Sequence, residues 1–311
     1  MIKKTDVKKK LVSVIVNCHN GQKYLNDAIQ SIVDQKYQNW EIIFWDNHSK
    51  DKSKKILKSF KDKRIRYFYS KKFTNLHQAR NLAIKKARGE FISFLDTDDI
   101  WESNKLHLQI EKFKKKKVNF VYGNCWLLNK DYIFKKKNYS NSNLPSGYIL
   151  NKLLKKYVIP LPTIMIRRSV LKKLRYCFNE KFKIIGDFDL SVRLSVKNIF
   201  ECVQEPIAYH RIHDGSFSVK NRFLEIRELS TWLKLAKKGG LGEEIKKSPN
   251  LKFVSRKIDY LKAIYNYNKN KNFIKSVVYL IKNLNQNNLK ILLKVFTPKY
   301  LKKKFSVYGQ L

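Results

Sequence analysis

The sequence is poor in cysteine and in long apolar runs, and each shortage excludes a class of protein. The four cysteines are widely separated and form no Cys-x-x-Cys pair: Cys18, Cys125, Cys177 and Cys202. Neither a disulfide framework nor a zinc site is indicated. No apolar stretch approaches the roughly 18 to 20 residues that span a bilayer, and residues 1–6 lack the apolar core of a signal peptide. We therefore expect a cytoplasmic protein.

Acidic residues are also scarce, because 25 Asp and Glu stand against 67 Lys and Arg and the formal net charge is +42. This excess favours an anionic partner such as nucleic acid, acidic lipid or a phosphorylated substrate. General composition explains it equally well, since lysine is spread along the whole chain. No nucleic-acid-binding motif is present, so we expect no nucleic-acid partner.

The C-terminal part has no acidic residue after Asp259. Between residues 273 and 301, apolar residues are interspersed with many lysines, which predicts a basic amphipathic end. We expect this end to bind an anionic membrane surface and to place the protein at the inner face of the cytoplasmic membrane. The alternative is a pair of solvated helices packed on the preceding domain.

The first part of the chain alternates strand-like and helix-like segments. Short apolar runs predict strands at residues 12–16, 41–45, 65–69 and 91–95, and amphipathic periodicity predicts helices at 24–34, 53–60, 76–87 and from 104 onward. This alternation predicts an α/β fold with a mainly parallel central sheet and helices on both faces. From 118 to 206 the pattern is irregular, with strand-like residues at 120–126 and 164–166, and beyond 220 it is helical.

Three aspartates crowd into the turn that follows the fourth predicted strand: Asp96, Asp98 and Asp99. Adjacent carboxylates repel one another, and Mg²⁺ or Mn²⁺ with a bound diphosphate compensates that repulsion through hard oxygen ligands. The alternative is a turn followed by a helix cap, because Asp is favoured in both places.

Polar residues also follow the other strands. Asn17 and His19 come after the first strand, and Asp46 and Asn47 after the second. In a sheet of strand order 3-2-1-4 the first and fourth strands are neighbours, and their carboxyl ends form a topological switch point where ligands bind. The sequence therefore predicts that three loops meet at one ligand site.

Five blocks of the sequence, spread over residues 11–218, form a recognisable series. The first is the opening strand at residues 12–17 with Asn20, Tyr24 and Leu25, and the second is the strand and turn at residues 41–49. The third is residues 79–81, 89–92 and 95–99 with Trp101 and Leu106. The fourth is residues 186–190 with Arg193, and the fifth is Tyr209 with residues 211–213 and 216–218. Together these blocks resemble the family-2 glycosyltransferases of the GT-A fold.

The resemblance implies inverting transfer of a sugar from a nucleotide-diphosphate donor to a hydroxyl of a saccharide or polyprenyl-linked saccharide, in surface polysaccharide or lipid-linked oligosaccharide synthesis. It implies that Asp98 binds the divalent metal directly, that Asp96 contacts the ribose or the metal shell, and that Asp99 supports them or caps a helix. Asp187 matches the catalytic base, and His213 a contact to the diphosphate or metal.

Several residues keep a second interpretation. Asp187 lies where a helix over residues 188–197 begins, so it is also a candidate N-cap, and His213 is also an ordinary loop histidine. Arg80 pairs either with phosphate or in a salt bridge. Asp189 is expected to be structural, and His210 matches no position of the family.

One departure concerns the base of the donor. Relatives often carry a second Asp where this chain has Asn47, and an Asn accepts a hydrogen bond from uracil more weakly than a carboxylate does. UDP is still the expected carrier, ahead of dTDP and GDP.

The predicted organisation is a basic tail at residues 1–10, a nucleotide-sugar half at 11–117, an acceptor half at 118–218 and a basic helical region at 219–311. A catalytically silent sugar-nucleotide binder and a nucleic-acid-binding protein are the alternative functions.

Overall fold

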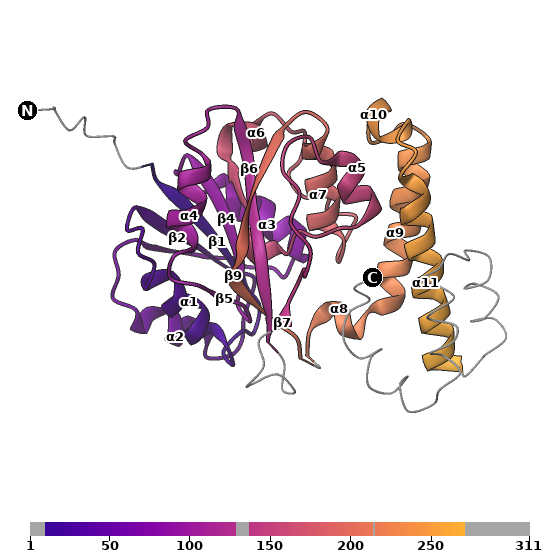
Figure 1. The fold of residues 1–311 in the computed structure, drawn as a ribbon. Helices are drawn as coiled ribbons and strands as arrows, with labels where there is room; N and C mark the ends of the chain where they lie inside the picture. Colours follow the sequence, from indigo (N-terminus) through magenta and orange to yellow (C-terminus); the bar gives the residue numbers. More distant parts are fainter. Residues whose placement is uncertain (1–9, 129–136, 214, 271–311) are drawn as a thin grey trace, which may run out of the picture. The chain divides into compact units, whose positions relative to one another are not determined.

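The computed structural model describes residues 10–128, 137–213 and 215–270 (Figure 1). The chain divides into two compact units, one formed by Met1–Ile149 and Val158–Arg211 and the other by Leu150–Tyr157 and Ile212–Leu311. The predicted division at residue 218 differs from this one in two ways: the second unit begins at Ile212, and it also includes Leu150–Tyr157. Local periodicity does not reveal that Leu150–Tyr157 packs with helices far along the chain. The predicted N-terminal tail, except Lys10, and the predicted basic end at 273–301 lie outside the described residues.

The first four strands of the first unit form the predicted parallel sheet. They are β1 (Val12–Cys18), β2 (Trp40–Asp46), β3 (Ile65–Tyr69) and β4 (Phe91–Asp96). Their order is β3-β2-β1-β4, and every neighbouring pair is parallel. The predicted strand order and the switch point between β1 and β4 are confirmed.

The second half of the sheet is mixed rather than parallel. Its strands are β5 (Ile100–Trp101), β6 (Val118–Leu128), β7 (Lys137–Asn138), β8 (Met165–Arg167) and β9 (Ile199–Arg211). The short strand β8 lies antiparallel between β4 and β6, and β9 runs parallel to β6 and antiparallel to β5. The prediction of a mainly parallel sheet therefore holds for the first four strands, whereas the second half combines one parallel pair, β6 with β9, with antiparallel pairs. The connection from β6 to β8 contains β7, the helix α5 (Leu150–Lys155) and the 3₁₀ turn η2 (Leu161–Thr163).

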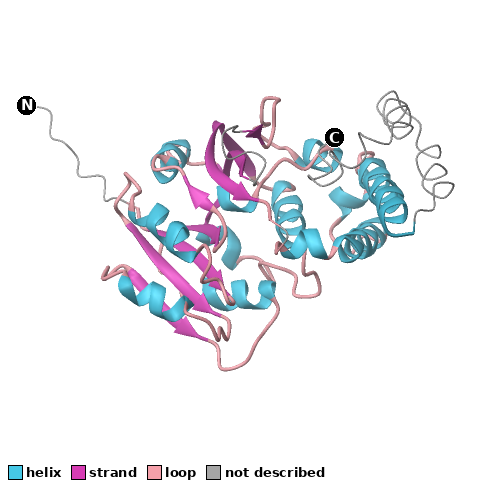
Figure 2. Cartoon of the chain, turned by 90° about the horizontal axis from the view of Figure 1, so that it is seen from below, coloured by secondary structure: helices cyan, strands magenta, loops and turns pink. Residues whose placement is uncertain are grey.

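Helices cover both faces of the parallel strands (Figure 2). On one face α1 (Leu25–Val33), α2 (Ser53–Ser59) and α4 (Lys105–Lys112) pack on residues such as Val14 and Phe44. The helix α3 (Leu76–Lys85) contacts β1 and β2. Along each strand the side chains alternate between the faces, so Asn17 shares its face with Ile15. The remaining helices of this unit are α6 (Arg168–Lys172) and α7 (Gly186–Ser195).

A fully buried lysine joins the two halves of this sheet. The Lys105 Nζ donates to Ser93 Oγ at 2.9 Å and to Gln109 Oε1 at 2.6 Å, and it lies 3.9 Å from the Trp101 ring centroid. Burial lowers the pKa of this amine well below its ordinary value. Gln109 and Trp101 in turn donate to the carbonyls of η2, so the network holds that turn against β4 and α4.

The second unit is helical. It contains α5 (Leu150–Lys155), α8 (Phe217–Lys220), α9 (Arg222–Lys237), α10 (Glu243–Lys246) and α11 (Leu251–Asn270). Trp232 of α9 is fully buried in its core, and Ser248 donates to the Asn151 side chain at 2.6 Å. Among the described residues, none of the helices combines the length and apolarity that crossing a bilayer requires.

Candidate functional site

The carboxyl ends of three parallel strands meet at one edge of the sheet, as the sequence predicts. Asn17 of β1 lies beside Asp96 of β4 in the strand register, and Cys18 of β1 lies beside Asp46 of β2. The three loops that carry polar residues therefore start from adjacent strands. This edge is the place where open α/β sheets bind ligands.

Asn17 is the clearest sign that this edge receives a ligand. Its side chain is only 8% exposed, yet neither its amide nitrogen nor its amide oxygen has a hydrogen-bond partner. A buried polar group without a partner costs about 1 to 3 kcal/mol, and native proteins rarely keep one without a reason. A bound molecule that offers both a donor and an acceptor would satisfy this amide.

The acidic turn is held by a buried arginine. The Nη2 atom of Arg80 donates to both carboxylate oxygens of Asp96, at 2.6 and 2.8 Å. The Arg80 side chain is buried, whereas the Asp96 side chain is 33% exposed. Of the two interpretations of Arg80, the structure shows the salt bridge, and its predicted contact to the donor stays a prediction.

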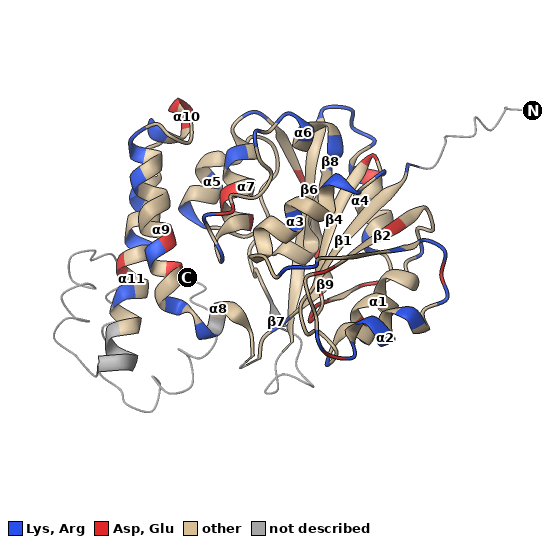
Figure 3. Cartoon of the chain, turned by 180° about the vertical axis from the view of Figure 1, so that it is seen from behind, with Lys and Arg blue, Asp and Glu red and all other residues tan. Residues whose placement is uncertain are grey.

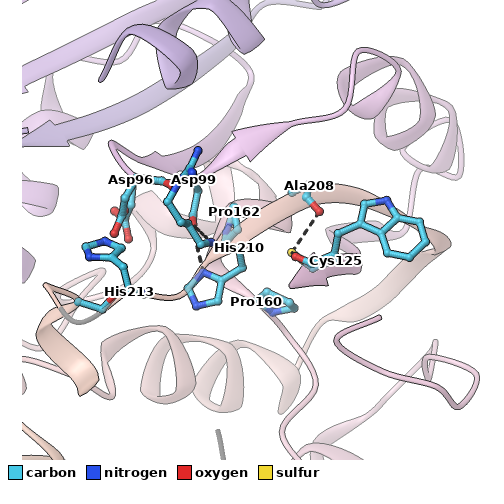
Figure 4. Close-up of polar contacts among 12 residues, drawn as sticks. Asp96, Asp99, Cys125, Pro160, Pro162, Ala208, His210 and His213 are labelled. Carbon is cyan, nitrogen blue, oxygen red and sulfur yellow. Dashed lines mark hydrogen bonds and ion pairs between the residues drawn. The ribbon is translucent and has the colours of Figure 1, made fainter. Parts of the chain in front are cut away.

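Asp99 fixes the turn to the end of β9 (Figure 4). Its buried carboxylate accepts a hydrogen bond from the Arg211 backbone N–H at 2.9 Å and lies 3.2 Å from His210 Nδ1. The Arg211 Nε also donates to the Asp98 carbonyl at 2.9 Å. Asp99 caps no helix, because α4 begins at Lys105 with Asn104 as its N-cap. Sequence reasoning missed His210, for which the only signal was its place beside Arg211.

Asp46 and Asn47 shape the loop after β2 rather than extending freely from it. The two carboxylate oxygens of Asp46 accept hydrogen bonds from the Ser49 N–H and the Tyr67 hydroxyl, both at 2.8 Å. Burial, followed by this bond to Asp46, raises the pKa of Tyr67 well above its ordinary value. The side-chain oxygen of Asn47 accepts from the N–H and hydroxyl of Thr74, at 3.2 and 2.9 Å.

Thr74 therefore competes with a nucleobase for the side-chain oxygen of Asn47, which was predicted to accept a hydrogen bond from the base. The Asn47 amide nitrogen also donates to the Thr74 carbonyl at 2.7 Å. His19 lies 3.0 Å from the Asn47 carbonyl through Nδ1, and its ring centroid is 4.5 Å from that of Phe73. The loop after β3 thus forms one wall of this edge of the sheet.

Asp187 lies in the first turn of α7 and is not its N-cap. The helix begins at Gly186 with Ile185 as the N-cap, so the capping interpretation is wrong. The Asp187 Oδ1 accepts a hydrogen bond from the Phe188 N–H at 2.9 Å, and its side chain is half-buried. Asp189, by contrast, is fully buried and paired with Arg193 at 2.9 Å, which confirms its structural role.

The helix α3 joins the acidic turn to the helix that carries Asp187. Besides the pair between Arg80 and Asp96, Asn81 exchanges two hydrogen bonds of 2.9 Å with the backbone of Phe178. His77 packs against Gly186 so closely that a Cβ on that glycine would lie 1.8 Å from His77 Nε2. Burial and the nearby Arg80 charge lower the pKa of His77 to about 3, so the imidazole is neutral.

His213 belongs to the second compact unit, where its N–H donates to Ser216 Oγ at 3.3 Å. Its predicted contact with the metal or diphosphate stays a prediction. Within the part of the chain that the structure describes, no three His, Cys, Asp or Glu side chains gather as a metal cage. Two carboxylates suffice for a Mg²⁺-type ion when substrate phosphates complete the shell, so Asp96 and Asp98 fit such an ion as a donor set.

A comparison with protein-family models identifies the family to which this chain belongs. The model for glycosyl transferase family 2 matches residues 13–175, which include the four parallel strands except Val12, the acidic turn and η2. The chain is a family 2 glycosyltransferase.

The glycosyltransferase is also similar to a curated relative over most of its length. It is 35% identical over 223 residues to UDP-Glc:alpha-D-GlcNAc-diphosphoundecaprenol beta-1,3-glucosyltransferase WfgD of Escherichia coli. The match covers 70% of this chain and 83% of WfgD.

Two solved structures share the fold of the glycosyltransferase. TarS 1-349 of S. aureus in complex with UDP-GlcNAc aligns with a TM-score of 0.57 at 18% identity, over 86% of this chain and 90% of TarS 1-349. Mannosyltransferase PcManGT of Pyrobaculum calidifontis, in complex with GDP-Man and Mn²⁺, aligns with a TM-score of 0.63 at 13% identity, over 95% of this chain and 83% of its own. The predicted GT-A type fold is thereby confirmed.

Proposed function

We propose that this glycosyltransferase moves a sugar, with inversion, from a UDP-sugar to a hydroxyl of a saccharide or polyprenyl-linked saccharide, and that it needs Mg²⁺ or Mn²⁺. The unsatisfied amide of Asn17 at the switch point carries the proposal, since it calls for a polar ligand at the predicted donor site. The name of WfgD, which pairs a UDP-Glc donor with a diphosphoundecaprenol-linked acceptor, supports this choice of donor and acceptor.

The donor half of the site is built from strand ends. Asn17 offers a donor and an acceptor, His19 offers an aromatic edge beside Phe73, and Asp46 and Asn47 hold the loop against which the nucleoside packs. Lys and Arg outnumber acids more than two to one over the chain, so the surrounding field favours a dianionic diphosphate.

Asp98 and Asp96 are the residues that would hold the divalent ion, and a contact from His213 is what the family resemblance implies. When bound, such an ion stabilises the negative charge that develops on the leaving diphosphate. Arg80 keeps the Asp96 carboxylate in one orientation through its two hydrogen bonds, and Asp99 keeps the turn in place through Arg211. The Asp96 carboxylate and the acidic turn are thus already held in place before the donor binds.

Asp187 is the base in this proposal. Its carboxylate takes the proton of the acceptor hydroxyl while the hydroxyl oxygen attacks the anomeric carbon opposite the leaving diphosphate. The Phe188 N–H at the N-terminal end of α7 donates to Asp187 Oδ1 at 2.9 Å and helps to orient the carboxylate.

The substitution Asp187→Asn tests this role. It removes the base but keeps the size of the side chain, so we expect transfer to fall by about 10² to 10⁴-fold. Stabilisation by UDP with Mn²⁺, measured by thermal shift, should persist. Asp34→Asn, which changes an exposed carboxylate at the end of α1, is the matched control and should keep full turnover. An Asp187→Asn enzyme with normal turnover would exclude Asp187 as the base.

A further inference from the structure

The outward face of α9 carries cations and large apolar side chains but no acidic ones. Its exposed residues, together with the C-cap residue, lie along one side of the helix: Phe223, Arg227, Thr231, Lys234, Leu235, Lys237 and Lys238. We call this set the α9 face. Phe223 is 56% exposed, whereas folded proteins bury most of the area of an aromatic ring.

Both glutamates of α9 are withdrawn from this face. Glu228 is buried, and Glu225 pairs with Arg222 at 3.3 Å and with Lys257 of α11 at 3.7 Å. The helix is already stabilised by the burial of an apolar stripe that includes Trp232. An ordinary solvated surface mixes both signs of charge, so the separation of acids from cations is not needed for folding.

The α9 face extends at one end and stops at the other. Before α9, Phe217 of α8 is 52% exposed and Lys220 is exposed as well. After α9, the short helix α10 carries Glu243 and Glu244, which Figure 3 shows in red at the end of α9 remote from α8. The exposed aromatic rings therefore lie toward α8, whereas Lys234 and Lys238 lie toward α10, whose acids mark that end of the face.

We propose that the α9 face is the docking surface of this enzyme for an anionic lipid bilayer. Cations on a helix attract acidic headgroups, and exposed Phe and Leu side chains enter the boundary between headgroups and acyl chains. Charge complementarity selects this occupant, because the face offers several cations and no acid to an anionic surface. The inference deepens the proposed function, since a polyprenyl-linked acceptor resides in a bilayer.

Vesicle sedimentation of the full chain tests the cations first. The probe is phosphatidylcholine vesicles with and without phosphatidylglycerol, at low salt. The triple change Arg227→Gln, Lys234→Gln and Lys238→Gln should weaken binding to the anionic vesicles at least tenfold, since each cation contributes about fivefold. The control Lys52→Gln, Lys55→Gln and Lys58→Gln removes the same charge from exposed positions on and beside α2 and should weaken it much less.

Vesicle binding at raised salt tests the apolar residues of the α9 face separately. Raising the salt screens the cations, so the binding that remains should fall further in the double variant Phe223→Ser and Leu235→Ser. If the cation variant binds the anionic vesicles as well as the α2 control does, the proposal is overturned.

Nucleotide binding separates this proposal from the proposed function. Thermal stabilisation by UDP with Mn²⁺ should be the same in the α9-face variants as in the unaltered chain, since none of the substituted residues belongs to the first unit. A chain that binds anionic vesicles through this face but shows no response to UDP would keep the docking surface and lose the proposed donor.

Discussion

The contact between His77 and Gly186 makes a quantitative prediction for the variant Gly186→Ala. The added Cβ would lie 1.8 Å from His77 Nε2, whereas such atoms normally stay about 3.4 Å apart, so the helix α7 or the imidazole must move by roughly 1.5 Å. Overpacking of this kind costs about 1 to 3 kcal/mol, which lowers Tm by roughly 2 to 10 °C in a chain of this size. Gly186 directly precedes Asp187, so the proposed base moves with it.

The variant Gly186→Ala should also lose activity. A displacement of about 1 Å at a reacting group lowers kcat by about 10²-fold. The assay measures Tm and kcat of Gly186→Ala, of His77→Ala and of the double variant. The smaller side chain at 77 makes room for the new methyl group, so in that background Gly186→Ala should cost less than about 0.5 kcal/mol. A single variant Gly186→Ala with unaltered Tm and kcat would refute the reasoning.

Two further predictions concern buried polar groups. Replacing Asn17 by Leu removes two buried atoms that lack partners, so the ligand-free protein should gain about 1 to 3 kcal/mol in urea unfolding while its thermal response to UDP disappears; a variant that is no more stable and still responds to UDP contradicts this. Folding lowers the pKa of His77 from 6.5 to about 3, so the unfolded chain binds a proton that the folded one excludes. Stability should therefore be intact above pH 6.5 and fall as the pH drops toward 3, by about 2 kcal/mol at pH 5. Unfolding of His77→Asn at the same pH values should lack this loss, and an equal loss in both proteins contradicts the assignment.

Much of the first half of the fold is predictable from local pattern. Apolar runs with a two-residue or 3.6-residue period place β1 to β4 and α1 to α3 within one or two residues of the observed bounds, and they place the start of α4 within one residue, because each element buries its own face against a neighbour in sequence. The parallel direction of these strands follows from the alternation of strands and helices. In the order β3-β2-β1-β4, their carboxyl ends bring Asn17, Asp46 and Asp96 to one edge.

The second half resisted prediction because its pairings are distant in sequence. The strand β8 is three residues long and acquires its direction from β4 and β6 on either side. Leu150–Tyr157 joins the second unit through contacts with helices a hundred residues later, such as the bond between Ser248 and Asn151. Neither feature has a local period that a sequence pattern records.

The sequence alone predicted which polar residues lie at this edge of the sheet, because the ends of the buried strands can be read from the local apolar pattern. Three-dimensional packing determined their partners: Arg80 with Asp96, Asp99 with His210 and Arg211, Asn47 with Thr74, and His77 with Gly186. These partners come from separate turns of the chain, and only the folded arrangement of strands and helices brings them within hydrogen-bonding or van der Waals distance.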